Sequence, residues 1–569
     1  MRRKRWLAAI LAAGTACTAL FGCGSRQIVG TEMARSGESP EKELQAWEEA
    51  KNTPYGKYPE LITYTLGKMI GGNRSNMPEQ DTYEDNVYTR YLRECLNIQN
   101  KDVFEAMEDQ YTVNVDMVIA SGELPDVMVI EDRETLLRLA EGGMIADLSE
   151  ALENCASDGI KAMYDSYEVS ALDSAMIDGR LMALPEPSFV DGPNLLWLRR
   201  DWMDELGLEA PDTIEEAVEI VRAFVEQDPG NNGEGNTIGL VCHSDLTGET
   251  GYRYEFQLNT FFASYNAFPK QWILQEDGTV VYGSVQPQVK EALAGVRKLY
   301  EEKLLDDSFM LRTMTNIAEL IVDGKCGSFF GPWWAPNNPL MEAMEKNPDA
   351  VWEPYLIRTT EDGKLQYYDQ NPSYKYVVVR KDFEHPEIVF KMASVMFDKM
   401  RTEEHNEELA YYFQTNVDST ARPISINIDY SDALHRCYED INAALTGETD
   451  PDELQVLEYA YYVKCKDYLD HSQSADAETW AAYESRIRAC ALLDNKDLEV
   501  CSTAFSGETE TMKTKWSKLH EMEKKLYLEI ITGVKELDEF DRFVEEWMEA
   551  GGEQITLEVT EAVREAKGA

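Results

Sequence analysis

The sequence predicts an α/β fold that continues into a helical C-terminal region. Apolar, β-rich runs alternate with amphipathic helical patterns from residue 61 to residue 380, which is typical of layered α/β domains. From Asp432 onward the pattern is mostly helical and rich in Tyr, Trp, Glu and Lys. A chain of 569 residues is long enough for roughly two to four domains, each with its own core.

Each expected element follows from its local pattern. Short apolar or β-branched runs predict strands at 61–66, 124–130, 181–185, 194–199 and 374–380. Apolar residues at helical spacing predict helices at 86–95, 113–121 and 135–142, and a further one near 41–51. Thr213 and Glu216 form a T-x-x-E capping box, which predicts a helix from there to residue 226.

The charge of the chain excludes several classes of partner. Asp and Glu number 105 against 54 Lys and Arg, a net charge of −51. A nucleic-acid binder needs clustered Lys and Arg to neutralise phosphates, and a protein that binds anionic lipid by charge needs them too. The acidic composition therefore argues against both classes. A neutral or cationic partner is compatible with this charge, and so is a charge that serves only solubility.

The first residues predict export and lipid anchoring. Arg2 to Arg5 form a charged region, 6–20 is apolar but short for a membrane span, and Leu20-Phe21-Gly22-Cys23 resembles a bacterial lipobox. This implies a signal peptide at 1–22 and diacylglycerol on Cys23; an ordinary signal peptide with an incidental cysteine is the alternative. Cleavage would leave 50 basic and 105 acidic residues, a net −55. Residues 23–58 are polar and predict a flexible tether to the outer face of the cell membrane.

No enzymatic motif is present. The chain has no GxSxG, HExxH or GxxxxGK[ST], and its six histidines are dispersed. Among 105 acids carboxylate pairs arise by chance, so a glycosidase pair is not assigned. No CxxC occurs among the ten cysteines, and Cys490 with Cys501 is the one pair to check for a disulfide.

Several motifs, in a fixed order, resemble one family. They are IASGELPDV at 119–127, GMIADL at 143–148, GRLMALP at 179–185, 196–213, GKCGSFFGPWW at 324–334, HPE at 385–387 and GVKELDEFDRFVEEWMEAGG at 533–552. The chain is similar, from about Leu61 to its end, to the sugar-binding extracellular solute-binding proteins (family 1, lipoprotein subgroup) of bacterial ABC importers. The match is loosest between 401 and 501.

This resemblance implies a two-lobed, periplasmic-binding-protein-like (type II) fold with a hinge and a helical C-terminal extension. The implied lobe I is 59–188 plus about 368–435, and lobe II is 189–367 plus about 436–569. Pro185, Pro187 and Pro193 break the chain near the first expected crossing, and 374–380 lies near the second. Closure of such lobes is a hinge motion.

The implied function is capture of a carbohydrate, an oligosaccharide, and its delivery to an ABC permease by a lipid-anchored monomer. The resemblance implies a protein that is not an enzyme and requires no cofactor. A lipid-anchored surface glycan-binding or glycan-degrading protein is the alternative, which a product-release assay would separate.

Candidate ligand residues combine flat aromatics with polar groups, because sugars present both an apolar face and hydroxyls. Trp333 and Trp334 follow the Gly331-Pro332 turn, and maltodextrin-binding members of the family use a Trp in this segment; we expect one ring to face the ligand and the other to pack. Further candidates for ligand contact are Glu131, Asp132 and Arg133, which follow the 124–130 strand. Tyr265 in an aromatic cluster, and Asn73 and Arg74 in the loop after the first strand, are also candidates. For each of these residues, a purely structural role is the alternative.

The segment 228–236 resembles a loop that binds calcium in alginate-binding members of the family. Asp228, Asn232 and Asn236 fit the first, fifth and ninth positions, and Glu234 could offer its carbonyl. Gly230 at the third position and Gly239 at the twelfth depart from the pattern. A structural Ca²⁺ site and a plain glycine-rich turn both remain open.

Overall fold

The computed structural model describes residues 40–167, 170–188, 192–248, 255–358, 365–368, 373–402, 406–471 and 476–568. The chain divides into two units, Met1–Gln45 and Ala46–Ala569, and the sheets formed by the described residues lie in the second. Within the described residues no helix is both long and apolar enough to span a membrane. Cys23 and the rest of the signal segment lie outside the described residues.

The first sheet has five strands in the order β2-β1-β3-β14-β6. Its strands are β1 (Ile62–Met69), β2 (Ile98–Ala106), β3 (Val127–Ile130), β6 (Leu184–Pro187) and β14 (Ser373–Val379). β1, β2 and β3 run parallel, whereas β14 pairs antiparallel with both β3 and β6. Helices α2 (Val87–Leu96), α3 (Glu108–Ser121), α4 (Arg133–Glu141), α5 (Ser149–Cys155), α6 (Asp158–Asp165) and α13 (Ile388–Ala393) share one apolar core with it. All four residues of β3 are buried, as expected for a strand covered on both faces.

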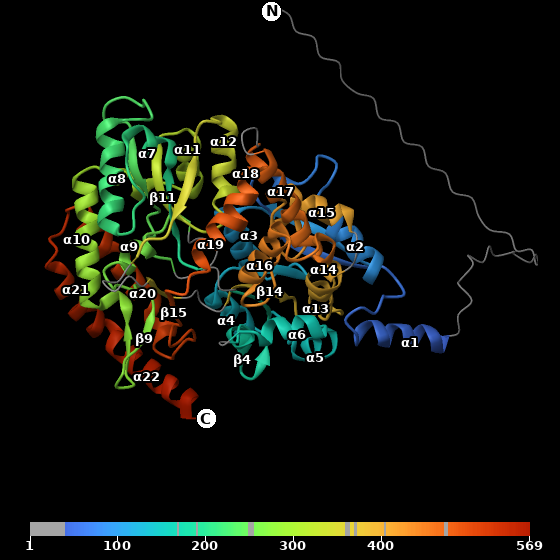
Figure 1. Ribbon diagram of the computed structural model, residues 1–569. Coiled ribbons are helices and arrows are strands. Elements are labelled where there is room, and N and C mark those ends of the chain that lie inside the picture. Colours follow the sequence, from blue (N-terminus) through green and yellow to red (C-terminus); the bar gives the residue numbers. More distant parts are fainter. Residues whose placement is uncertain are drawn as a thin grey trace, which may run out of the picture. The chain divides into compact units, whose positions relative to one another are not determined.

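The second sheet has four strands in the order β12-β7-β11-β8. Its strands are β7 (Leu195–Arg199), β8 (Ile238–Val241), β11 (Cys326–Gly331) and β12 (Trp352–Tyr355). Helices α7 (Arg200–Leu206), α8 (Ile214–Gln227), α10 (Pro287–Glu301), α11 (Met314–Val322) and α12 (Met341–Lys346) belong to this half, and Figure 1 shows α7, α8 and α11 around β11. The chain passes from the first sheet to the second after β6 and returns between β12 and β14.

The C-terminal helices divide between the two cores. They are α15 (Glu407–Gln414), α16 (Ala433–Thr446), α17 (Val456–His471), α18 (Ala477–Tyr483), α19 (Cys490–Leu493), α20 (Met512–Ile531), α21 (Glu539–Trp547) and α22 (Glu553–Gly568). Ala460 of α17 joins the core of the first sheet, whereas Trp480 of α18 packs with Trp197 of the second. α20 contacts α10, so the red and green segments of Figure 1 lie side by side.

Two small sheets complete the second half. The hairpin β9 (Trp272–Leu274) and β10 (Val280–Tyr282) is antiparallel and packs on α22. β13 (Leu365–Tyr368), on the return between the two main sheets, pairs in parallel with β15 (Leu498–Cys501). The short helix α9 (Asn259–Ala263) contacts β13.

The predicted elements are confirmed, but several further elements were not predicted, among them the strands β2, β8, β11, β12, β13 and β15. β1, β3, β6, β7, β14, α2, α3, α4, α8 and the helix α1 (Pro40–Lys51) lie where the sequence placed them, and the Thr213–Glu216 capping box is present. β2 and β15 were not predicted, because β2 is an edge strand whose exposed positions carry Lys101 and Glu105, and β15 is a short strand among helices. The eight cysteines among the described residues are free, so Cys490 and Cys501 form no disulfide.

The tether was expected to extend to residue 58, but Ala50 and Tyr58 are buried in the core of the first sheet. The Tyr58 hydroxyl donates to Glu387 Oε1 at 2.7 Å, and Lys391 Nζ donates to the Thr53 carbonyl at 2.6 Å. The Cys155 thiol donates to the Lys51 carbonyl at 3.1 Å. Residues 46–58 are therefore part of the folded second unit.

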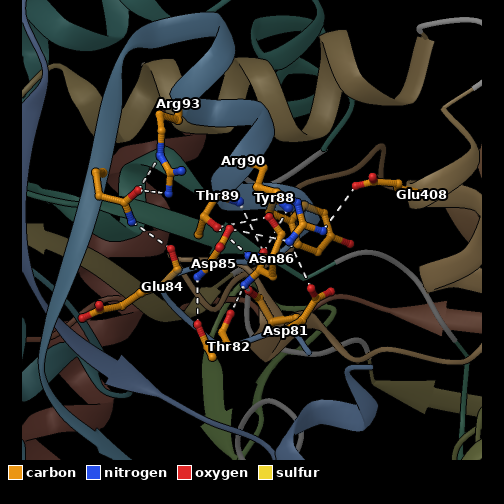
Figure 2. A network of polar contacts seen from close by, with 12 residues as sticks. Asp81, Thr82, Glu84, Asp85, Asn86, Tyr88, Thr89, Arg90, Arg93 and Glu408 are labelled. Atoms are coloured by element: carbon orange, nitrogen blue, oxygen red, sulfur yellow. Dashed lines mark hydrogen bonds and ion pairs between the residues drawn. The ribbon is translucent and has the colours of Figure 1, made fainter. Parts of the chain in front are cut away.

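A polar network at the start of α2 joins the N-terminal half to the segment that follows α15. The Asn86 side chain accepts the Tyr88 and Thr89 N–H groups and forms a capping box with Thr89. It also donates to the Ala421 carbonyl at 3.1 Å. Arg90 pairs with Asp81 at 3.0 Å and with Glu408 at 3.3 Å, as Figure 2 shows. Through this network, Asn86 both caps the N-terminus of α2 and binds the segment that contains Ala421.

Lys68 anchors the same segment from the end of β1. Its side chain is fully buried, and Nζ donates to the carbonyls of Thr420 and Arg422, both at 2.6 Å, and to Ser425 Oγ at 2.7 Å. Burial lowers the pKa of the Lys68 ammonium. Three acceptors at short distance meet the hydrogen-bonding need of the buried group, and they hold 420–425 against the carboxyl end of the strand.

We expect Lys68→Met to lower the free energy of unfolding by about 3–5 kcal/mol, because two carbonyls and a hydroxyl lose a buried donor. Lys101→Met on neighbouring β2 is the matched control: its side chain is exposed, so it should change stability by less than about 0.5 kcal/mol. Urea unfolding of both variants measures this. Equal stability of the two variants would show that the Lys68 contacts do not hold the segment.

Candidate functional site

The two candidate tryptophans lie in the turn after β11 and face different surroundings. Trp333 is 6 % exposed and packs in a core with Ala335, Leu340 and Trp480. The guanidinium carbon of Arg486 lies 4.5 Å from the centre of the Trp333 ring and 4.2 Å from the Tyr461 ring. Arg486 thus covers one face of Trp333, a cation–π contact supplied by a C-terminal helix.

Trp334 is half-buried and packs at the edge of the same core. Trp333 is therefore the more deeply buried of the two rings. Ligand contact by either ring stays a prediction.

The acidic and basic residues after β3 serve the start of α4. Asp132 is the N-cap of this helix, and its carboxylate accepts the Thr135 N–H at 2.6 Å. Arg133 Nε donates to the Ser174 carbonyl at 3.1 Å, and Glu131 accepts from the Thr112 hydroxyl at 3.3 Å. These contacts are those of the structural alternative, a charge set at a helix N-terminus. A ligand role for the three side chains stays untested.

Tyr265 and the loop after the first strand also have protein partners. The Tyr265 ring lies 5.5 Å from that of Phe261, and burial raises the pKa of its hydroxyl. Arg74 is exposed, and its guanidinium donates to the Asp81 carbonyl. Asn73 lies in the same 3₁₀ turn (Gly72–Asn76). Ligand contact at Tyr265, Asn73 and Arg74 stays a prediction.

A cavity of about 680 Å³, its open mouth included, lies beside β13 and α9. Its walls come from the crossing after β6, from the loop after β8, from α9 and the loop after it, and from β13. The lining residues are Gly192, Pro193, Asn194, Thr247, Gly248, Asn259, Thr260, Ala263, Ala267, Phe268, Pro269, Gln271, Leu365, Gln366, Tyr367 and Tyr368. The cavity therefore lies where both chain crossings meet the second half of the protein.

The cavity holds buried amide groups that no protein atom satisfies. Gln271 is 7 % exposed, and its Oε1 has no hydrogen-bond partner. Asn259 Oδ1 is likewise buried and unpaired. Both side-chain polar atoms of Gln257, which lies against Gly248 of the wall, are unpaired as well. A buried polar group without a partner costs about 1–3 kcal/mol, so these amides are expected to take their partners from water or from a bound molecule.

One wall of the cavity is aromatic. The rings of Phe268 and Tyr368 lie 4.7 Å apart at 51°, and burial raises the pKa of the Tyr368 hydroxyl. Thr247 and Thr260 are buried at the other side, where the Thr260 hydroxyl donates to the Asn194 carbonyl at 2.7 Å. A wall of rings beside amides and hydroxyls suits a molecule with an apolar face and a hydroxyl rim.

None of these cavity residues was among the candidates from the sequence. The available signal was the grouping of amides and aromatics in QLNTFF at 257–262 and in FPKQW at 268–272. It could not be assigned to a cavity, because the opposite wall is β13, about a hundred residues further along the chain.

The loop after α8 does not fit a calcium site. The Asp228 carboxylate accepts the Asn232 and Gly233 N–H groups at 2.9 and 2.8 Å and the Thr237 hydroxyl, and the hydrogen bond from Thr237 lowers the pKa of Asp228. Lys325 Nζ donates to Asn232 Oδ1 at 3.0 Å, so an ammonium occupies the oxygen that a cation would need. Asn236 donates its amide to the Asn232 carbonyl at 3.1 Å.

Glu234 is exposed in this loop. Across the described residues, no group of three or more His, Cys, Asp or Glu side chains could hold a metal. Gly230 is required by packing rather than by a metal, because a Cβ there would lie 2.5 Å from the Trp202 ring. The glycine-rich turn, the second reading of the sequence, is the arrangement observed.

The chain has relatives with described roles. The sequence profile of the family described as bacterial extracellular solute-binding protein matches residues 74–399. The polygalacturonan/rhamnogalacturonan-binding protein YtcQ of Bacillus subtilis (strain 168) is 22 % identical over 456 residues, which cover 79 % of this chain and 82 % of YtcQ. Lipoprotein LipO of the same organism is 21 % identical over 468 residues, covering 81 % and 85 %.

Solved structures share the fold. The alginate-binding protein AlgQ2, crystallised without calcium ion, superimposes with a TM-score of 0.58 at 15 % identity and covers 90 % of this chain and 99 % of its own. This likeness confirms the predicted two-lobed α/β fold with its helical C-terminal extension.

We expect Trp333→Ala to lower the free energy of unfolding by about 3–5 kcal/mol, because it leaves a core cavity beside Arg486. Trp334→Ala removes a half-buried ring and should cost at most about 2 kcal/mol. Urea unfolding followed by circular dichroism measures both. A larger loss for Trp334→Ala would contradict the assignment of Trp333 as the packed ring.

A chelator should leave the melting temperature unchanged, because Lys325 and the Asp228 contacts close the 228–237 loop without a metal. Lys325→Met should lower the melting temperature with or without added calcium, since Asn232 loses its cationic donor. Differential scanning calorimetry in EDTA and in calcium measures both responses. A calcium-dependent rise in the wild-type melting temperature would restore the metal site.

Proposed function

This chain belongs to the bacterial extracellular solute-binding proteins, and from that premise we propose that it captures a carbohydrate for an ABC importer. Members of this family bind solutes and are not enzymes, which agrees with the expectation from the missing catalytic motifs. The observation that supports a carbohydrate ligand is the cavity beside β13, whose lining includes both unpaired amide oxygens and aromatic rings. YtcQ, whose name records a polysaccharide ligand, supports the same class.

The mechanism proposed is closure of two lobes on the sugar. The two sheets have separate apolar cores, and the chain crosses between them at 188–194 and 356–372, which suits a hinge. We assign lobe I to 59–188 with about 368–435, and lobe II to 189–367 with about 436–569. Ala50 and Tyr58 add the segment before residue 59 to the core of lobe I, and Ala460 of α17 reaches the same core. The cavity lies against both crossings, so a sugar bound there would contact the segments that bend on closure.

Delivery to a permease and anchoring by lipid on Cys23 complete the proposal. The similarity to lipoprotein LipO supports the anchor, and the absence of a spanning helix from the described residues is consistent with it. Helix α1 begins at Pro40, so the tether that would reach the outer face of the membrane is 24–39. A surface glycan-degrading protein, the alternative, has no support in the family.

We expect Tyr368→Ala to weaken sugar binding more than tenfold, because a central aromatic anchor contributes about 2 kcal/mol or more. Tyr411→Ala on α15 is the matched control, since Tyr411 is exposed and far along the chain from the cavity walls; it should bind normally. Isothermal calorimetry with the sugar found by a thermal-shift screen measures both.

Normal sugar binding by Tyr368→Ala would place the ligand outside this cavity. If no sugar in a broad glycan panel raises the melting temperature of the native protein, the proposed carbohydrate function is wrong.

We further expect Cys23→Ala to release the protein from membranes into the medium or periplasm. Loss of the acyl chains removes about 0.8 kcal/mol per buried CH₂ of membrane affinity. Fractionation of cells that express each form measures this. A variant that stays in the membrane fraction would contradict the lipid anchor.

A further inference from the structure

The described lining of the cavity is uncharged. Its polar side chains are amides and hydroxyls, and no Lys, Arg, Asp or Glu is among the sixteen lining residues. Lys270, between the lining residues Pro269 and Gln271, pairs with Asp245 at 2.8 Å. A carboxylate brought into this cavity would leave water without a counter-charge from these residues, which is costly.

The unpaired groups call for a ligand that donates hydrogen bonds. Gln271 Oε1, Asn259 Oδ1 and Gln257 Oε1 are acceptors, and Gln257 Nε2 is a donor. A hydroxyl both donates and accepts, so sugar hydroxyls can satisfy the two acceptors on lining residues, Gln271 Oε1 and Asn259 Oδ1. An ionised carboxylate only accepts, and it would leave the buried amide oxygens unpaired.

The net negative charge of the whole chain also disfavours binding of anionic sugars. A net charge of −51 creates a negative potential that lowers the local concentration of anionic chains and slows their association. A neutral sugar is indifferent to this field.

We propose that the cavity is specific for a neutral oligosaccharide and discriminates against uronate sugars. This inference rests on the proposed carbohydrate function and narrows its substrate class. It separates this chain from YtcQ and AlgQ2, whose names record polygalacturonan and alginate, because both of those polymers carry carboxylates. The difference is carried by the amide and aromatic lining that faces the cavity.

Calorimetric titration of the full-length mature protein tests the proposal. The probes are neutral gluco-, fructo-, galacto- and xylotetraose on one side, and tetragalacturonate and tetramannuronate on the other. We expect at least one neutral sugar to bind about 100-fold more tightly than either uronate, since buried groups left unpaired discriminate strongly. Its affinity should also change less than about twofold between low salt and about 0.3 M salt, because no charge pair forms.

A charge-introducing variant sharpens the test. Gln271→Lys places an ammonium in the wall, and we expect it to weaken the neutral sugar at least about tenfold and to reduce the preference over uronate. Gln110→Lys on α3 adds the same charge at an exposed position and should leave both affinities unchanged.

The outcomes are distinct. Tightest binding of a uronate sugar overturns the neutral specificity and leaves the carbohydrate function standing. Binding of no sugar from either set overturns both proposals. Unchanged affinities in Gln271→Lys would show that the discriminating wall is elsewhere.

Discussion

A buried polar group needs a hydrogen-bond partner, and the architecture of this protein depends on where the chain supplies one. Lys68 at the end of β1 finds three acceptors in 420–425, and so the segment after α15 is held against the first sheet. Beside β13, none of the described residues supplies a partner for Gln271 Oε1, Asn259 Oδ1 or the side-chain amide of Gln257. In the first case the hydrogen bonds hold a distant segment against the sheet, and in the second they leave acceptors that water or a ligand can satisfy.

The C-terminal helices contribute side chains to the apolar cores of both halves. α20 and α22 thicken the core of the second sheet, and α17 contributes Ala460 to the core of the first. Arg486 lies between the rings of Trp333 and Tyr461, so that the turn after β11 is covered by a helix from the extension. Of the two adjacent tryptophans, the ring that Arg486 covers is thereby part of the packing, and the accessible aromatic wall is that of Phe268 and Tyr368.

Local pattern was enough for most of the fold. The Thr213 capping box, the apolar run of β3 and the β-rich run of β14 each predict their structure from a few neighbouring residues. The ordered motifs from residue 61 onward indicated the family.

The candidate site was harder to predict. Asp132 and Arg133 lie directly after β3, as predicted, but their contacts are those of residues at the start of a helix. The residues that line the cavity do not form a recognisable local sequence pattern. These residues line one cavity only because β13 contacts α9. That contact depends on the path of the chain between the two sheets and cannot be predicted from any short segment. The calcium loop shows the same limit: Lys325, which closes it, lies about ninety residues after Asn232.

The most direct test is a crystal structure of the protein with the neutral tetrasaccharide that binds most tightly. The account predicts the sugar in the cavity between β13 and α9, with hydroxyls within hydrogen-bond distance of Gln271 Oε1 and Asn259 Oδ1 and one ring face against Tyr368. A sugar bound outside this cavity, with the amides of Gln271 and Asn259 still unpaired, would contradict it.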